Sequence, residues 1–185
     1  MGIRYSISFL LIATCFVSIV LHLSAPRQHG VEIFVMDGVF LSQQNRFSFT
    51  DATLGTVKLP STATVLDSEV VEYDWETHTI TLTPEGCNRL PRSGEFSIAV
   101  PMYFIFSVNR KPCYMGCITN RITNFGTNYP AIVSEDLPTR GGTKPVDITI
   151  KPKSSASQVQ INKDGRYNDT LKSWLERTGR LKESG

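Results

Sequence analysis

Residues 77–83 constrain the fold more than any other part of this chain of 185 residues. Thr77-His-Thr-Ile-Thr-Leu-Thr83 alternates strictly, so that His78, Ile80 and Leu82 share one face and four threonines share the other. A period of two residues is typical of a strand with one buried and one exposed face. We therefore expect a half-buried β-strand here.

A short helix should follow this strand directly. Thr83 is a favourable N-cap, Pro84 fits the first helical position, and Glu85 suits the positive end of a helix. Pro91 cannot continue a helix, so this element must be short.

Strand-like runs dominate the remainder of the chain. β-branched and aromatic residues gather in segments that turn residues separate, as is typical of strands. These segments are Val31–Met36, Phe96–Val100, Tyr103–Val108, Cys113–Ile118, Pro130–Val133 and Val146–Ile150. We expect Asn109–Pro112 to form a turn and Ser68–Glu72 to form one turn of helix.

A second helix is expected near the C-terminus. Leu171, Trp174 and Leu175 would form its apolar face, with Asn168 or Asp169 as its cap. Together the elements predict an α+β fold: a small, mostly antiparallel sheet with two or three short helices, preceded by one N-terminal hydrophobic helix.

The N-terminal segment predicts a membrane anchor. Ile7 to Leu23 contains no Asp, Glu, Lys or Arg, and its roughly 17 residues fall between a signal-peptide core and a transmembrane helix. Cleavage after Ala25 is disfavoured by Leu23 and Pro26, so we expect an uncleaved signal anchor. Cleavage, which would give a secreted or periplasmic protein, and lipidation at Cys15 are the alternatives.

The predicted organisation has three parts. Residues 1–24 form the signal anchor, residues 25–30 form a linker, and residues 31–185 form a single α+β domain, which we place on the extracytoplasmic side. The net charge is only +2, without the concentrated basic stripe of a nucleic-acid binder, so we expect no nucleic-acid partner.

The cysteines are expected to be small buried side chains. Cys113 and Cys117 would lie about 13 Å apart on one strand, too far for a disulfide. A bridge from Cys87 to one of them is the alternative if the domain is oxidised.

Candidate chemistry is sparse. His78 lacks a ligand spacing or a marked catalytic partner, and its face suggests a hydrogen-bonded core histidine. Arg140-Gly-Gly-Thr-Lys144 is superficially similar to an anion loop, but it leads into a strand rather than a helix. We therefore expect no enzyme, no cofactor and no metal site. A hydrolase or metalloenzyme that uses His78 remains an alternative.

The candidate contact surface consists of Tyr73, Trp75, Asn120, Asn124 and Tyr129. The last three belong to a polar loop over Thr119–Tyr129. For Tyr73 and Trp75, core packing is the competing interpretation.

Tyr73-Asp-Trp75, Thr77-His-Thr-Ile80, Leu82-Thr-Pro-Glu85 and Leu90 resemble a family of uncharacterised small bacterial proteins, membrane-anchored or exported. Gly94, Phe96, Tyr114-Met-Gly116 and the closing run Leu171, Leu175, Gly179 and Leu181 extend the resemblance over roughly residues 65–182. The order of elements is also similar to the head of the periplasmic domain in SecD-type export translocase subunits. That resemblance implies a compact α+β interaction module rather than an enzyme.

These observations predict a membrane-anchored extracytoplasmic interaction or structural domain, with the membrane and an unidentified protein as partners. A binder of a small ligand or of a cell-envelope polymer is the alternative.

Overall fold

The computed structural model of the chain describes residues 30–38, 54–96, 102–120, 129–152 and 165–182. Its first sheet has the strand order β1-β4-β5-β6. The strands are β1 (Val31–Asp37), β4 (Met102–Val108), β5 (Lys111–Thr119) and β6 (Ala131–Val133). β1 and β5 are both antiparallel to β4, and β6 runs parallel to β5. The strands predicted in these four regions are confirmed, whereas the one predicted over Phe96–Val100 lies largely outside the described residues.

The β4–β5 hairpin turns more tightly than predicted. Asn109 and Arg110 have φ values of 51° and 66°, the left-handed pair that a two-residue turn requires. β5 therefore begins at Lys111, and Pro112 lies inside it, opposite Ser107 at a shift in the register. Proline is tolerated there because a bulge does not need its missing N–H.

The second sheet has the order β7-β3-β2-β8. Its strands are β2 (Val70–Asp74), β3 (Thr79–Leu82), β7 (Val146–Thr149) and β8 (Leu181–Lys182). The alternation in β3 is confirmed: Ile80 and Leu82 are buried, while Thr79 and Thr81 lie on the outer face. The Thr79 hydroxyl bonds the Thr149 hydroxyl at 3.1 Å across the strands.

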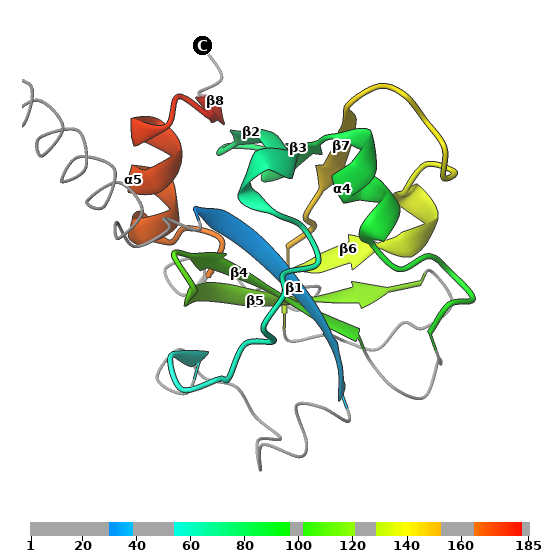
Figure 1. The fold of residues 1–185 in the computed structure, drawn as a ribbon, viewed down its shortest axis with the longest axis horizontal. Coiled ribbons are helices and arrows are strands. Elements are labelled where there is room, and N and C mark those ends of the chain that lie inside the picture. Colours follow the sequence, from blue (N-terminus) through cyan, green and yellow to red (C-terminus); the bar gives the residue numbers. More distant parts are fainter. Residues whose placement is uncertain (1–29, 39–53, 97–101, 121–128, 153–164, 183–185) are drawn as a thin grey trace, which may run out of the picture.

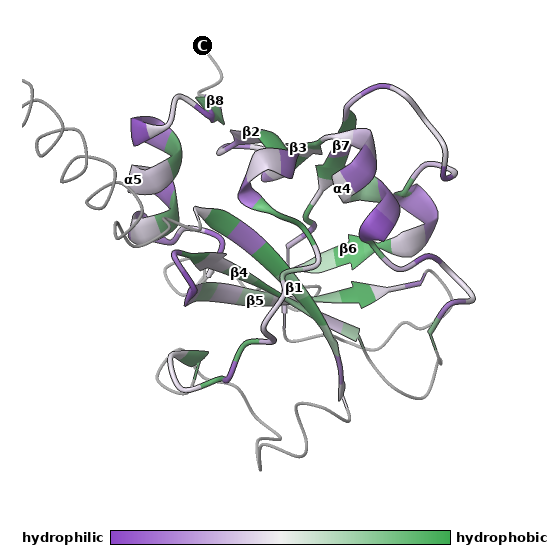
Figure 2. Cartoon of the chain, viewed as in Figure 1, coloured by the Kyte–Doolittle hydropathy of each residue, from purple (hydrophilic) through white to green (hydrophobic). Residues whose placement is uncertain are grey.

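Both predicted α-helices are confirmed. α4 (Pro84–Arg89) begins after Thr83, whose hydroxyl accepts a hydrogen bond from the N–H of Gly86 at 3.3 Å. α5 (Asp169–Arg177) begins after Asn168, whose side chain caps the N–H of Leu171 at 3.1 Å. α5 buries the three predicted apolar side chains and turns its polar side outwards (Figure 2). Two 3₁₀ helices, η1 (Asp67–Glu69) and η2 (Ser134–Asp136), complete the described elements.

The main core lies between the two sheets, which form two layers with α5 at one side (Figure 1). Phe104 and Phe106 of the first sheet share this core with Tyr73 and Ile80 of the second and with Leu171 of α5. A single antiparallel bridge between Ala131 and Lys151 joins the sheets at one edge. The two layers therefore depend on one shared apolar interior.

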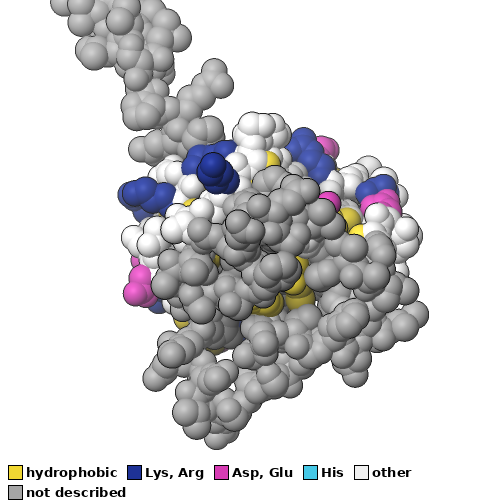
Figure 3. Space-filling model, turned by 90° about the horizontal axis from the view of Figure 1, so that it is seen from below, with side chains coloured by type: hydrophobic (Ala, Val, Ile, Leu, Met, Phe, Trp, Pro, Cys, Tyr) yellow, Lys and Arg dark blue, Asp and Glu magenta, His cyan; other side chains and the backbone are white. Residues whose placement is uncertain are grey.

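A smaller cluster lies on the opposite face of the first sheet. Met36, Ile105 and Met115 pack there with Leu54 and Val57. From below, hydrophobic side chains are visible in the centre of the molecule, and Lys and Arg side chains stand along its rim (Figure 3). The first sheet is thus buried on both faces, which explains the nearly continuous apolar sequence of β4.

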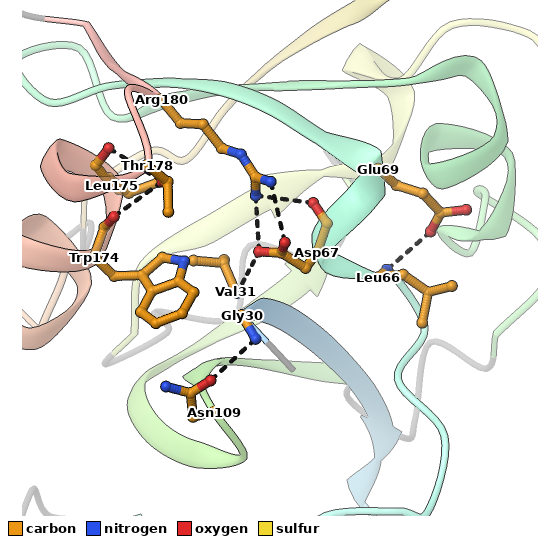
Figure 4. Close-up of polar contacts among 10 residues, drawn as sticks. All are labelled: Gly30, Val31, Leu66, Asp67, Glu69, Asn109, Trp174, Leu175, Thr178 and Arg180. Carbon is orange, nitrogen blue, oxygen red and sulfur yellow. Dashed lines mark hydrogen bonds and ion pairs between the residues drawn. The ribbon is translucent and has the colours of Figure 1, made fainter. Parts of the chain in front are cut away.

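The two ends of the described chain meet at Asp67 (Figure 4). Its carboxylate accepts the N–H of Val31 at 2.7 Å and a bidentate pair of bonds from Arg180 at 2.7 and 3.0 Å. Arg180 follows α5, and its carbonyl oxygen accepts the N–H of Tyr73 at 2.9 Å. One carboxylate therefore ties β1 to the C-terminal segment.

The predicted α+β class is wrong. The described chain is mostly β, with two four-stranded sheets and two short α-helices rather than one small sheet. The error arises at Ser68–Glu72, where one helical turn was expected. Only a 3₁₀ turn forms, and Val70–Asp74 becomes a strand because it pairs with β3 on one side and β8 on the other. Such pairing between distant segments overrides a local helical preference.

The expected membrane-spanning helix also requires correction. The described α-helices contain six and nine residues, whereas a transmembrane helix needs about 20 apolar residues. No helix within the described ranges is long and apolar enough to cross a membrane. The prediction of a transmembrane signal anchor is thus wrong for the described part of the chain, and residues 1–24, where it was placed, lie outside that part.

Candidate binding groove

Tyr73, the first predicted contact residue, lies in the main core with none of its surface exposed. Its hydroxyl lies 3.0 Å from Nδ1 of His78, and its ring meets Phe106 edge-on at 6.3 Å. Core packing, the competing interpretation, therefore describes Tyr73.

Trp75 lies at the edge of the same cluster and is half-buried. Its ring centroid is 5.9 Å from Tyr73 and 6.1 Å from Tyr167. The ammonium group of Lys172 stands 5.7 Å from the ring centroid of Trp75. These contacts attach the β2–β3 turn to the start of α5.

The other predicted contact residues are not adjacent to these two. Asn120 is buried, and Asn124 lies outside the described residues. Tyr129 is half-buried and meets Tyr103 edge-on at 5.9 Å within the smaller cluster. Burial, reinforced by Tyr129, raises the pKa of Tyr103. The predicted surface is therefore divided between two clusters on opposite faces of the first sheet.

The groups with the most chemical potential are buried. His78 has 2 % of its surface exposed and a left-handed backbone with a φ of 51°. Cys87, Cys113 and Cys117 are buried, as expected, and none of them forms a disulfide. Burial raises the pKa of Cys113 to about 11, so this thiol remains protonated at neutral pH. Among the described residues, no group of three His, Cys, Asp or Glu side chains could hold a metal ion.

A groove of about 320 Å³ lies between α4 and the loop that precedes β7. We call it the α4 groove, and its described wall consists of Pro84, Cys87, Asn88, Pro138, Thr139, Gly142, Thr143, Lys144, Pro145 and Val146. Three prolines, a valine and a cysteine make most of this wall apolar. Of the described lining residues, Lys144 carries the one charge.

The loop side of the groove is held in place by Arg140. Its guanidinium pairs with both carboxylate oxygens of Glu95 at 2.6 and 2.8 Å and donates to the carbonyl oxygen of Asn88 at 3.2 Å. The N–H of Gly141 donates to the side-chain oxygen of Asn88 at 3.3 Å. The backbone N–H of Arg92, followed by the charge of Arg140, lowers the pKa of Glu95. The loop is therefore built onto the end of α4 rather than left free in solvent.

The helix side is fixed by two further arginines. Arg89 pairs with the carboxylate of Glu69, with both guanidinium nitrogens 3.0 Å from its oxygens. Arg92 donates to the carbonyl oxygen of Cys87 at 2.9 Å and to its sulfur at 3.5 Å. The arginines on both sides of the groove are thus held in hydrogen bonds and ion pairs that fix its walls. Lys144, by contrast, forms no ion pair within the described chain.

Sequence reasoning did not find this groove. Arg140–Lys144 is only superficially similar to an anion loop because a strand is expected after it, and β7 does follow it. The usable signal was the density of proline and glycine over residues 138–145, beside Asn88 at the end of a short helix. Their proximity is a long-range contact that periodicity does not reveal.

Neither a protein-family model, a curated protein nor a solved structure matches this chain. The resemblance of the Tyr73–Glu85 run to small bacterial exported proteins therefore stays a prediction.

Proposed function

We infer that this chain is a non-catalytic protein-binding domain and that the α4 groove is its contact site. The observation that carries this inference is the groove itself: a concave, mostly apolar surface whose loop wall is anchored by the Arg140–Glu95 pair. Exposed apolar concavities with a few polar groups at the rim are typical of binding sites.

The polar groups at the rim suit recognition better than catalysis. Lys144 and the Thr143 hydroxyl are exposed donors, and no carboxylate or imidazole occurs among the described lining residues. Cys87 reaches the wall, but 2 % of its surface is exposed and its sulfur accepts a bond from Arg92. A general base near a nucleophile, which hydrolysis requires, is thus lacking among the described groups of this groove.

A small-ligand site is less well supported. A concave pocket beside Asn120, Asn124 and Tyr129, in the polar loop, would favour that alternative, whereas none of these residues lines the α4 groove. Its volume of about 320 Å³ stands at the lower limit of small-molecule sites, which enclose most of their ligand.

Site-specific crosslinking tests the inference. In cells that produce the protein naturally, Thr143 of the full chain is replaced by the photoreactive residue benzoylphenylalanine. Irradiation should then crosslink the chain to one discrete partner protein. The same residue at Thr170, exposed at the start of α5, is the position control. Equal labelling at the two positions, or none at Thr143, would contradict a contact site in the groove.

A groove-filling substitution supplies a second control. Gly142 lines the groove and a Cβ there meets no atom within 4 Å, so Gly142→Trp can be accommodated and is expected to obstruct the groove. Gly55 is equally open and lies outside the groove, so Gly55→Trp adds the same side chain elsewhere. We expect the Thr143 crosslink to be lost in the first variant and retained in the second.

A further inference from the structure

The α4 groove adjoins an edge strand, because Val146 both lines the groove and begins β7. β7 is the outermost strand of the second sheet and pairs with β3 alone over Val146–Thr149. The N–H of Ile150 bonds the carbonyl oxygen of His78 at 2.9 Å. Backbone bonds to one neighbour recur at every second residue of an antiparallel strand. Ile148 and Val146 therefore face β3 in the same way.

The backbone groups of the alternate residues of β7 point in the opposite direction. The backbone N–H and C=O groups of Asp147 and Thr149 point away from β3, as do those of Lys151. Lys151 already uses this edge, because it exchanges two bonds with Ala131 at 2.8 and 2.9 Å. On the side of β7 away from β3, no second strand pairs with Asp147 or Thr149 within the described residues. The edge is thus occupied at Lys151 and open over the two preceding outward-facing residues.

The side chains beside this edge differ in charge on its two sides. Lys144 stands at the groove, just before β7, without an ion pair in the described chain. Asp147 lies on the outer face of the sheet, where its carboxylate accepts the hydroxyl of Thr81 at 2.7 Å. A strand laid along β7 would meet a cation next to the apolar groove and an anion on the outer face.

We propose that the edge of β7 binds an extended acidic–apolar peptide as an added strand. Backbone bonds to Asp147 and Thr149 hold the peptide, one apolar side chain enters the α4 groove, and a neighbouring carboxylate lies beside Lys144. This mode of recognition takes affinity from the main chain and specificity from alternate side chains. The proposal rests on the proposed function and adds the class of partner.

Charge complementarity selects this occupant. The apolar wall of prolines and Val146 fits a side chain such as leucine, and Lys144 attracts an adjacent acid. Asp147 disfavours a second acid on the outer face. A basic or wholly polar peptide satisfies neither condition.

The test is an NMR titration of the full chain, labelled with ¹⁵N, with a capped hexapeptide that alternates leucine and serine and ends in glutamate. We expect the amide signals of Thr143, Lys144, Asp147 and Thr149 to shift. In the Lys144→Glu variant the Kd for this peptide should rise about fivefold, as for one exposed charge pair. A second peptide, with lysine in place of glutamate, should bind the Lys144→Glu variant more tightly than it binds the natural chain.

A third peptide completes the experiment. N-methylation of the residues that face β7 removes the backbone donors and should weaken binding at least tenfold. If the methylated peptide binds equally well, or if preference does not follow the charge at position 144, the proposal is overturned. A retained Thr143 crosslink would then leave the groove as a contact site for another partner, whereas loss of that crosslink would overturn the proposed function as well.

Discussion

At the scale of single residues, Gly116 occupies a position in β5 that leaves no room for a side chain. The sequence resemblance contains Tyr114-Met-Gly116, and the structure supplies a physical reason for the glycine. A Cβ at Gly116 would lie 2.0 Å from the ring of Phe104 and 2.6 Å from the carbonyl oxygen of Pro130. Phe104 cannot yield easily because its ring is fully buried.

We therefore predict that Gly116→Ala lowers the free energy of unfolding by about 3 kcal/mol, since overpacking forces buried side chains and backbone to move. Urea unfolding monitored by tryptophan fluorescence measures the change. Gly142→Ala is the matched control, because a Cβ there meets no atom within 4 Å. If the free energy of unfolding falls no more in Gly116→Ala than in Gly142→Ala, β4 and β5 can adjust to the added methyl group at little cost.

At the scale of elements, the cap of α5 has two functions. The side-chain oxygen of Asn168 accepts the N–H of Leu171, and its amide nitrogen donates to the carbonyl oxygen of Cys113 at 3.0 Å. The first bond begins the helix and the second holds the helix against β5.

Asn168→Ala removes both bonds and should cost about 2 kcal/mol, the upper end of the range for a lost cap. Ser173→Ala, at an exposed position within α5, should change stability by less than about 0.5 kcal/mol. Chemical denaturation of both variants gives the comparison. Equal effects would mean that packing alone positions α5.

The loop beside the α4 groove should respond to acid through Glu95. The pKa of Glu95 is lowered in the folded chain, so its stabilising contribution is present above the unfolded pKa and is lost as the pH falls through the lowered folded value. The carboxyl ¹³C signal of Glu95 should report a midpoint below that of an unperturbed glutamate, and the amide of Gly141 should shift with it. Glu95→Gln should abolish that amide transition, and a transition that persists would assign it to another group.

At the scale of the whole molecule, the shared core predicts one cooperative unfolding transition. Both sheets and α5 contribute to a single apolar interior, so neither layer can lose this core without exposing the other. Asp67 and Arg180 add a polar link between β1 and the segment after α5.

A double-mutant cycle measures this link. Asp67→Ala should cost more than Arg180→Ala, since only the former also frees the N–H of Val31. The coupling between the two residues should be about 1–2 kcal/mol, as for a partly buried bidentate pair. Both variants should retain a single transition in urea. A coupling near zero would mean that the two ends of the described chain are held by packing alone.

The candidate site was less predictable than the fold. Sequence reasoning correctly gave α4 from Thr83 and Pro84, and therefore one wall of the groove. Tyr73 stayed open between a contact surface and core packing, because an aromatic residue beside a turn is compatible with both. The surroundings of Tyr73 are set by Phe106, which belongs to the other sheet, and by His78, which lies beyond the turn after β2.

The sequence by itself determined the elements whose signals are local: the alternating strand from Thr79 to Leu82, the capped helix after Thr83, and the apolar face of α5. Caps and periodicity act within a few residues, so they can be read without knowing the neighbours. The tertiary structure alone decided that Val70–Asp74 is a strand, that two sheets form instead of one, and that a proline-lined loop meets α4. Each of these depends on the free energy of pairing or burial between segments far apart in the chain.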